Sequence, residues 1–233
     1  MNTPLSAPVA RTTGLHYLAM ALVAVPGFLV LRPLLHDPGS AAATLTNLVA
    51  DESLARLGIA LELTLVVAQT LTALWFFRLF RAVDSFAAAA LATFGLLNAV
   101  AVLGSTAGLT AALDAALAGD ADGAQLMYGL SDGMWGAGAV FFGLWLLPMG
   151  LLARRSGMPR PLGWFLLAGG VGYVVGAYLA VLAPGTGAVG DALAYVATIG
   201  EFWMIGTLLW IGLRRRPQAP VVDVPAPGVA VRP

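Results

Sequence analysis

The sequence predicts an all-α membrane protein with six transmembrane helices and both termini in the cytoplasm. Three observations lead to this fold class: an apolar composition, six long apolar segments, and arginines that gather at alternate helix ends. Of the 233 residues, 59% are apolar and only 10% are charged. Soluble domains rarely have this composition, so we expect the lipid bilayer to be the main partner of the chain.

Each apolar segment is long enough to cross a hydrocarbon core about 30 Å thick, which takes roughly 20 helical residues. The predicted helices cover residues 14–36, 53–81, 85–109, 124–153, 162–184 and 191–213. Residues 1–13 would form a short cytoplasmic segment before them. Residues 214–233 contain repeated prolines, which prevent a continued helix, so we expect a disordered cytoplasmic tail.

A short additional helix is predicted at about residues 40–50, between the first two transmembrane helices. Ser40 can cap its first turn, since serine is a preferred residue at that position. Leu45, Leu48 and Val49 would share one face of this helix. An apolar face of this kind is typical of a helix that lies in the membrane interface.

The arginines assign the two sides of the membrane. Nine of them gather at one set of helix ends: Arg11, Arg78, Arg81, Arg154, Arg155, Arg160, Arg214, Arg215 and Arg216. The opposite ends carry only Arg32 and Arg56, together with most of the aspartates. Because arginines near helix ends are retained in the cytoplasm, we expect a multi-pass protein of the inner cell membrane with both termini cytoplasmic.

Several kinds of chemistry are not supported by the composition. The chain has no cysteine, which excludes disulfides, thiolate metal sites and a cysteine nucleophile. His16 and His36 lie at opposite ends of the first predicted helix, about 30 Å apart by helical rise, too far to share a metal. We find no catalytic motif and no basic patch suited to nucleic acid, so neither an enzyme nor a cofactor is expected.

Four stretches resemble a known family: RTTGLHYLAMALVAV, VFFGLWLLPMGLL, RRSGMPRPLGWFLLAGGVGY and GEFWMIGTLLW. The most specific element is a loop with the residues Ser156, Gly157, Pro159, Arg160, Leu162 and Gly163. On these motifs the chain is similar to a bacterial multi-pass membrane family classified only as a domain of unknown function, DUF4386. The resemblance implies a six-helix membrane fold, and it implies no activity and no catalytic residue.

Polar residues inside the predicted helices are the candidate functional residues. Counted from the cytoplasmic ends, Glu201, Glu62 and Asn98 lie roughly 20–24 Å into the membrane, whereas Asp132 and Arg32 lie at about 30 Å, near the outer surface. Their side chains should face the bundle interior, because a charged group at bilayer depth costs at least about 2.5 kcal/mol.

Sequence spacing groups some of these residues on common helix faces. Gln69 follows Glu62 by seven residues, as Ser105 follows Asn98, so each pair projects from one side of its helix. Trp135 and Trp203 lie close in sequence to the acids Asp132 and Glu201. These two tryptophans could therefore form the walls of a pocket.

Two hypotheses account for these residues. In the first, Glu62, Gln69, Asn98, Asp132 and Glu201 form an outward-facing acidic pocket that binds or transports a proton, a cation or a small polar ligand. In the second, Arg32 pairs with Glu62 or Glu201, Asn98 and Gln69 bridge helices, and this network fixes packing in a non-catalytic interaction or assembly subunit. The spacing of Gly172 and Gly176 would also allow a homodimer through the fifth helix.

The arginine distribution makes a topology prediction. A reporter fused after Arg216 should be active in its cytoplasmic form, because three consecutive arginines precede the fusion point and resist export. Alkaline phosphatase and green fluorescent protein fusions at this position measure the two alternatives. High phosphatase activity would contradict the assigned orientation.

Overall fold

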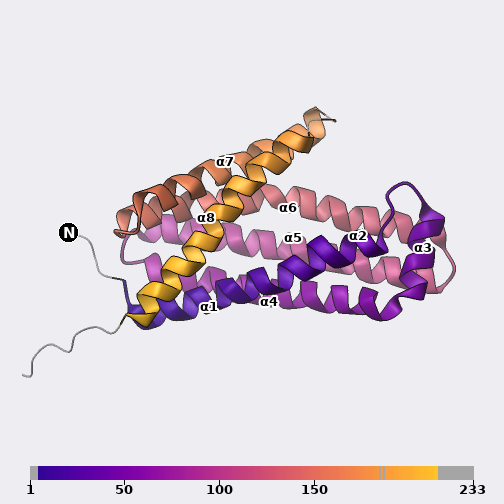
Figure 1. Cartoon of the computed structure of the whole chain (residues 1–233), viewed down its shortest axis with the longest axis horizontal. Coiled ribbons are helices and arrows are strands. Elements are labelled where there is room, and N and C mark those ends of the chain that lie inside the picture. The colour runs from indigo at the N-terminus through magenta and orange to yellow at the C-terminus, as the bar shows by residue number, and fades with distance from the viewer. Residues whose placement is uncertain (1–4, 184, 186, 215–233) are drawn as a thin grey trace, which may run out of the picture.

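The computed structural model describes residues 5–183, 185 and 187–214, and this part of the chain is helical without any strand (Figure 1). Six of its helices are long and apolar enough to cross a membrane: Ala7–Leu35, Glu52–Phe80, Ser85–Leu117, Ala121–Arg155, Arg160–Leu182 and Tyr195–Leu213. Of the tail predicted at residues 214–233, residues 215–233 lie outside the described residues. The all-α class with six membrane-length helices is confirmed.

The first span combines three elements without a break. They are α1 (Ala7–Ala24), the π-helix η1 (Val25–Leu31) and α2 (Arg32–Leu35). Pro26 lies in the first turn of η1, and proline cannot donate the backbone hydrogen bond that a regular α-helix requires inside the chain. The widened turn changes the rotational position of the residues beyond it, and Arg32 is the first of these residues.

The remaining elements are α3 (Ala41–Ala50), α4 (Glu52–Phe80), α5 (Ser85–Leu117), α6 (Ala121–Arg155), α7 (Arg160–Leu182) and α8 (Gly187–Leu213). Two helix boundaries differ most from those predicted from the sequence. The first helix begins at Ala7 rather than Gly14, and α5 continues to Leu117 rather than ending at Leu109. The α5 extension is stabilised by burial of Leu113 and Ala116.

Side-chain caps define the start of three helices. The Ser40 hydroxyl accepts the Ala43 N–H at 3.1 Å, and carboxylates of Asp84 and Asp120 cap α5 and α6 in the same way. The Ala87 N–H, helped by the neighbouring Arg155 guanidinium, holds the pKa of Asp84 below its ordinary value despite partial desolvation. Asp84 therefore remains ionised as the cap of α5.

The six spans form a closed ring in chain order. Each span packs against the one that follows it in the chain, from the first span through α4, α5, α6 and α7 to α8. Helix α8 then packs against α1, which closes the ring. The start of α1 and the end of α8 meet at one end of the bundle (Figure 1), where Gly212 leaves room for Arg11. We call this the arginine-rich end; the opposite end, where α3 lies across the bundle, is the α3 end.

Two apolar clusters fill the ring. The larger one is centred on Tyr17, Phe76 and Trp145, all at most 1% exposed. The smaller one lies at the α3 end, where Leu48 and Tyr128 are both 2% exposed. Helices α7 and α8 contribute no described residue to this second cluster.

Helix α3 packs against α5 and α6 through part of its surface. Thr44 and Leu48 are buried, Leu45 is half-buried and Val49 is exposed. The Thr44 hydroxyl contacts the backbone of Asp37 at 3.1 Å. The inward face is therefore Thr44 and Leu48, and α3 closes the end of the bundle in addition to any contact with the membrane surface.

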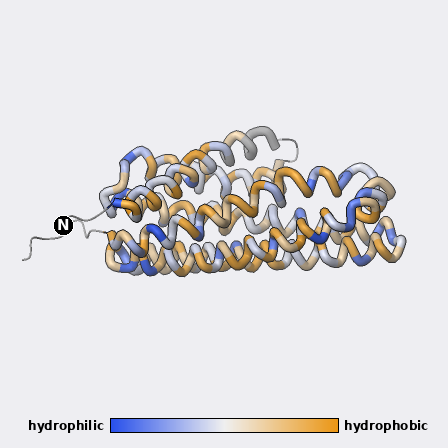
Figure 2. Tube along the Cα trace, turned by 60° about the horizontal axis from the view of Figure 1, so that its bottom comes forward, coloured by the Kyte–Doolittle hydropathy of each residue, from blue (hydrophilic) through white to orange (hydrophobic). Residues whose placement is uncertain are grey.

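The outer surface of the bundle is apolar over much of its length. Large side chains are widely exposed on it, including Phe86 at 84% and Val181 at 77%. Hydrophilic residues gather toward the two ends (Figure 2). Exposed apolar surface on this scale is rare on soluble monomers, and it indicates a membrane-embedded protein.

Close helix contacts depend on glycine where α6 meets α7. A Cβ atom at Gly170 would lie 2.8 Å from the carbonyl oxygen of Gly143, and a Cβ atom at Gly143 would lie 2.7 Å from that of Gly170. Gly133, on the same helix as Gly143, has no such neighbour within 4 Å. On α7, Gly172 is buried within the chain and Gly176 is half-buried.

Alanine substitutions at these glycines test the packing. Gly143→Ala and Gly170→Ala should each lower the free energy of unfolding by about 1–3 kcal/mol, because the added methyl group forces α6 and α7 apart. Gly133→Ala is the matched control, and it should be neutral or stabilising by up to about 1 kcal/mol because alanine is the better helix former. Thermal unfolding in one detergent compares them; equal effects at all three positions would contradict the assigned contact.

Candidate functional site

Arg32 is the centre of a buried polar network at the α3 end. Its side chain is 8% exposed. Glu62 accepts hydrogen bonds from its Nε at 3.0 Å and its Nη2 at 2.6 Å. Asp132 accepts one from Nη1 at 2.5 Å. The guanidinium therefore joins α2 to two carboxylates, one on α4 and one on α6.

Hydroxyl groups complete the network. The hydroxyls of Ser105 and Ser131 lie 2.6 and 2.9 Å from Nη2 of Arg32, which shares its two N–H groups between them and Glu62, and these two oxygens lie 2.8 Å apart. Ser105 in turn donates to the second oxygen of Glu62 at 3.1 Å. With α5 added in this way, four elements of the bundle meet at one guanidinium.

Aromatic rings surround the ion pair. The rings of Phe28, Tyr128 and Trp135 lie with their centroids 5.6, 5.9 and 5.7 Å from Cζ of Arg32. The Trp135 indole N–H also donates to Glu62 at 3.3 Å. Cation–π attraction adds to the ion pairs here.

Asp132 links the network to the surface. Its side chain is 45% exposed, against 5% for Glu62. Its second oxygen lies 3.3 Å from Nδ1 of His36, and the His36 ring stacks on Tyr128 at 4.2 Å. Among the described residues, Nε2 of His36 is buried without a hydrogen-bond partner.

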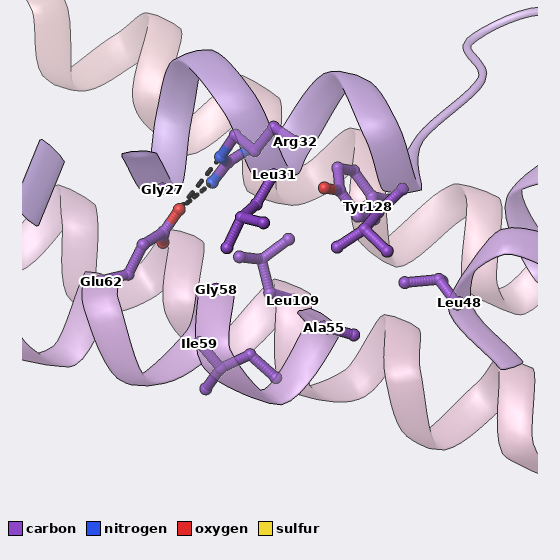
Figure 3. Close-up of a pocket in the computed structure, with 11 residues that line it drawn as sticks. Gly27, Leu31, Arg32, Leu48, Ala55, Gly58, Ile59, Glu62, Leu109 and Tyr128 are labelled. Atoms are coloured by element: carbon purple, nitrogen blue, oxygen red, sulfur yellow. Dashed lines mark hydrogen bonds and ion pairs between the residues drawn. The ribbon is translucent and has the colours of Figure 1, made fainter. Parts of the chain in front are cut away.

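A small cavity adjoins the network on the side of α4. Arg32 and Glu62 lie at one end of it, and apolar side chains such as Leu31, Ile59 and Leu109 line the rest (Figure 3). Its volume is about 10 Å³, which is room for roughly one water molecule. The buried part of the network is therefore nearly dry.

A second polar layer joins α4, α5 and α6 deeper in the bundle. The Gln69 amide donates to Asn98 at 2.6 Å, and the Asn98 amide donates to the carbonyl oxygen of Gly138 at 2.8 Å. Gly138 allows this approach, since a Cβ atom there would lie 3.2 Å from the Asn98 nitrogen. This layer lies about 10 Å along α4 from Glu62, by helical rise over seven residues.

Glu201 belongs to a third, separate contact. It accepts a hydrogen bond from the Tyr17 hydroxyl at 2.6 Å, which joins α8 to α1. Trp203 lies nearby in sequence, but it is 37% exposed and its ring faces Phe165 on α7. Neither Glu201 nor Trp203 has a contact with the Arg32 network among the described residues.

The candidate residues thus divide into three groups rather than one pocket. Arg32, Glu62, Asp132 and Trp135 come together; Gln69 pairs with Asn98; Glu201 pairs with Tyr17. The spacing of seven residues correctly indicates which side chains share a face. Tyr17, Phe28 and Tyr128 were not singled out in the sequence, because an aromatic residue in an apolar helix gives no signal of a polar partner.

A family model described as Domain of unknown function (DUF4386) matches residues 12–212. The chain belongs to the DUF4386 family. No curated protein and no solved structure matches the chain. All three polar groups of this DUF4386 protein lie within the matched residues. In the described part of the chain, no group of three or more histidines and acidic residues is placed to hold a metal ion.

The Arg32–Glu62 pair makes a stability prediction. Glu62→Gln should lower the free energy of unfolding by about 1.5–3 kcal/mol, because it replaces the buried carboxylate that accepts from Nε and Nη2 with a neutral amide, while Asp132 still balances the charge of Arg32. Glu52→Gln is the matched control, since Glu52 pairs with Arg56 on the exposed surface of the same helix and such pairs contribute at most about 1 kcal/mol. Thermal unfolding of the purified proteins measures both; similar losses would contradict a structural dependence on the buried pair.

Proposed function

We propose that this DUF4386 protein binds a proton, a cation or a small polar ligand at the Arg32 network, from the α3 end of the bundle. The observation that carries the proposal is the half-exposed carboxylate of Asp132, which shares one guanidinium with the buried Glu62. Two carboxylates on one arginine leave one formal negative charge. A site with a net negative charge and one exposed carboxylate favours a positively charged ligand.

His36 favours a proton as that ligand. With its Nδ1–H directed to Asp132, the neutral ring keeps a free lone pair on Nε2, which has no partner among the described residues. A proton bound at Nε2 would give an imidazolium beside the Asp132 carboxylate, with Tyr128 stacked on it and Arg32 across the carboxylate.

The orientation derived from the arginines completes the proposal. In a multi-pass protein of the inner membrane with cytoplasmic termini, the α3 end faces the outside, so the ligand enters from there. Transport would in addition need a route from Glu62 to Glu201. The nearly dry cavity beside Glu62 supports binding more than passage.

A structural role is the second candidate. It is favoured by the dense pairing of Arg32 with two carboxylates and two hydroxyls, since a network of this kind can hold helices in register without any ligand. The protein would then act as a non-catalytic interaction or assembly subunit. A homodimer through Gly172 and Gly176 stays a prediction of this candidate.

Ligand binding is tested by thermal unfolding of the purified protein across pH and a panel of monovalent and divalent cations. A ligand at about one hundred times its Kd stabilises by about 2.7 kcal/mol, which raises Tm by roughly 5–10 °C for a chain of this size. Asp132→Asn should abolish this response, because it removes the exposed charge. Glu52→Gln, at an exposed acid of the same end, should retain it.

The variants also separate the two candidates. Glu201→Gln should retain the response if the site is the Arg32 network, and it should lose the response if the ligand reaches the middle of the bundle. A response in Asp132→Asn equal to that of the wild type would contradict the proposed site. No response to any condition would favour the structural candidate.

A further inference from the structure

Three arginines at the arginine-rich end lie over tryptophan rings. In each case the guanidinium carbon is within 5.0 Å of the ring centroid: Arg78 over Trp75 at 4.8 Å, Arg154 over Trp164 at 4.3 Å, and Arg214 over Trp210 at 5.0 Å. The three pairs lie on different helices around the ring: the first on α4, the second between α6 and α7, and the third at the end of α8, where Arg214 directly follows the helix. We call them the Arg–Trp pairs.

Positive charge at this end exceeds negative charge. Seven arginines of the described chain lie here: Arg11, Arg78, Arg81, Arg154, Arg155, Arg160 and Arg214. Asp84 is the acidic residue beside them, and it forms an ion pair with Arg155. In the described range, none of the guanidiniums in the Arg–Trp pairs has a carboxylate partner.

The Arg154 pair shows how a guanidinium is held in place. The side-chain stem crosses Gly163, where a Cβ atom would collide with its Cγ and Cδ. Its guanidinium then rests on Trp164, which is 59% exposed. A guanidinium that lies over a ring contacts it through its face, so its edge N–H donors can bind phosphate oxygens in pairs.

The position of the tryptophans indicates which phosphate groups these guanidiniums could meet. Trp164 and Trp210 are 59% and 60% exposed on the outside of the bundle, next to apolar surface such as Leu213, which is 70% exposed. Tryptophan rings in this position lie at the level of the lipid headgroups. The edge donors of the Arg154 and Arg214 pairs therefore lie where phospholipid phosphates are concentrated; in the third pair Trp75 is half-buried.

We propose that the Arg–Trp pairs are binding sites for the headgroups of anionic phospholipids. Each guanidinium binds the phosphate of one lipid, the tryptophan holds the guanidinium in position, and the acyl chains cover the exposed apolar surface beside the ring. A zwitterionic lipid carries a cationic group as well as the phosphate, so it gains less from the excess positive charge. The α3 end lacks such sites in the described structure, because Arg56 pairs with Glu52 and Arg32 is buried.

The test uses the full chain purified in detergent with equimolar phosphatidylglycerol and phosphatidylcholine, and native mass spectrometry then identifies the bound lipids. The wild type should retain phosphatidylglycerol preferentially. The triple variant Arg78→Gln, Arg154→Gln, Arg214→Gln should lose this preference, each arginine contributing roughly fivefold to the relative affinity. Arg56→Gln, at the opposite end, is the matched control and should behave as the wild type.

Two further measurements distinguish loss of charge from loss of the ring contact, and lipid from free phosphate. A triple variant with lysine at the same positions preserves charge but not planar stacking, so it should fold and retain an intermediate preference. Inorganic phosphate added to protein in phosphatidylcholine nanodiscs should not raise Tm, whereas phosphatidylglycerol in the nanodisc should.

Three results would overturn the proposal. They are an unchanged lipid preference in the glutamine variant, an equal loss in Arg56→Gln, and stabilisation by inorganic phosphate equal to that by phosphatidylglycerol. The last result would assign the sites to free phosphate. Because none of the substituted residues belongs to the Arg32 network, these results are independent of ligand binding at Asp132.

Discussion

A guanidinium buried inside a membrane-length helix bundle must have partners for its charge and for its N–H groups, and this requirement shapes the structure around Arg32. The cavity beside it has a volume of about 10 Å³, so its partners come from the protein: Glu62 on α4, Ser105 on α5, and Ser131 and Asp132 on α6. Each contact fixes the rotation and depth of the helix that supplies it. The α3 end is consequently held together by polar contacts and by the apolar cluster beneath α3, without a described residue from α7 or α8.

The same requirement explains the other polar residues of the interior. Gln69 and Asn98 satisfy each other and a backbone carbonyl, and Glu201 accepts from Tyr17. Each group joins helices that are neighbours in the ring. Where α6 meets α7, glycines let the backbones approach closely, and dispersion forces take the place of side-chain hydrogen bonds.

The two ends of the molecule differ in how they present charge. At the α3 end, one carboxylate of a buried network reaches the surface, so a ligand there would act on the contacts that hold four elements together. At the arginine-rich end, the guanidiniums of the Arg–Trp pairs lie over tryptophan rings and have no carboxylate partner in the described chain. Their N–H groups therefore remain available to groups outside the protein. Binding at the first end would change the stability of the bundle, whereas binding at the second would anchor the bundle in its lipid.

Composition and the spacing of apolar and arginine residues were sufficient to establish the helix class and the six spans, because a membrane-length helix is a local property of about 20 residues. Seven-residue spacing also indicated that Glu62 and Gln69 share a face. Residue spacing within one helix gives no information on distances between helices. The sequence therefore could not show which acid pairs with Arg32, and it could not show that Glu201 lies apart from that network. The contacts of Arg32 with Glu62 and Asp132 depend on packing between segments far apart in the chain, and so does the closed ring that places Tyr17 beside Glu201.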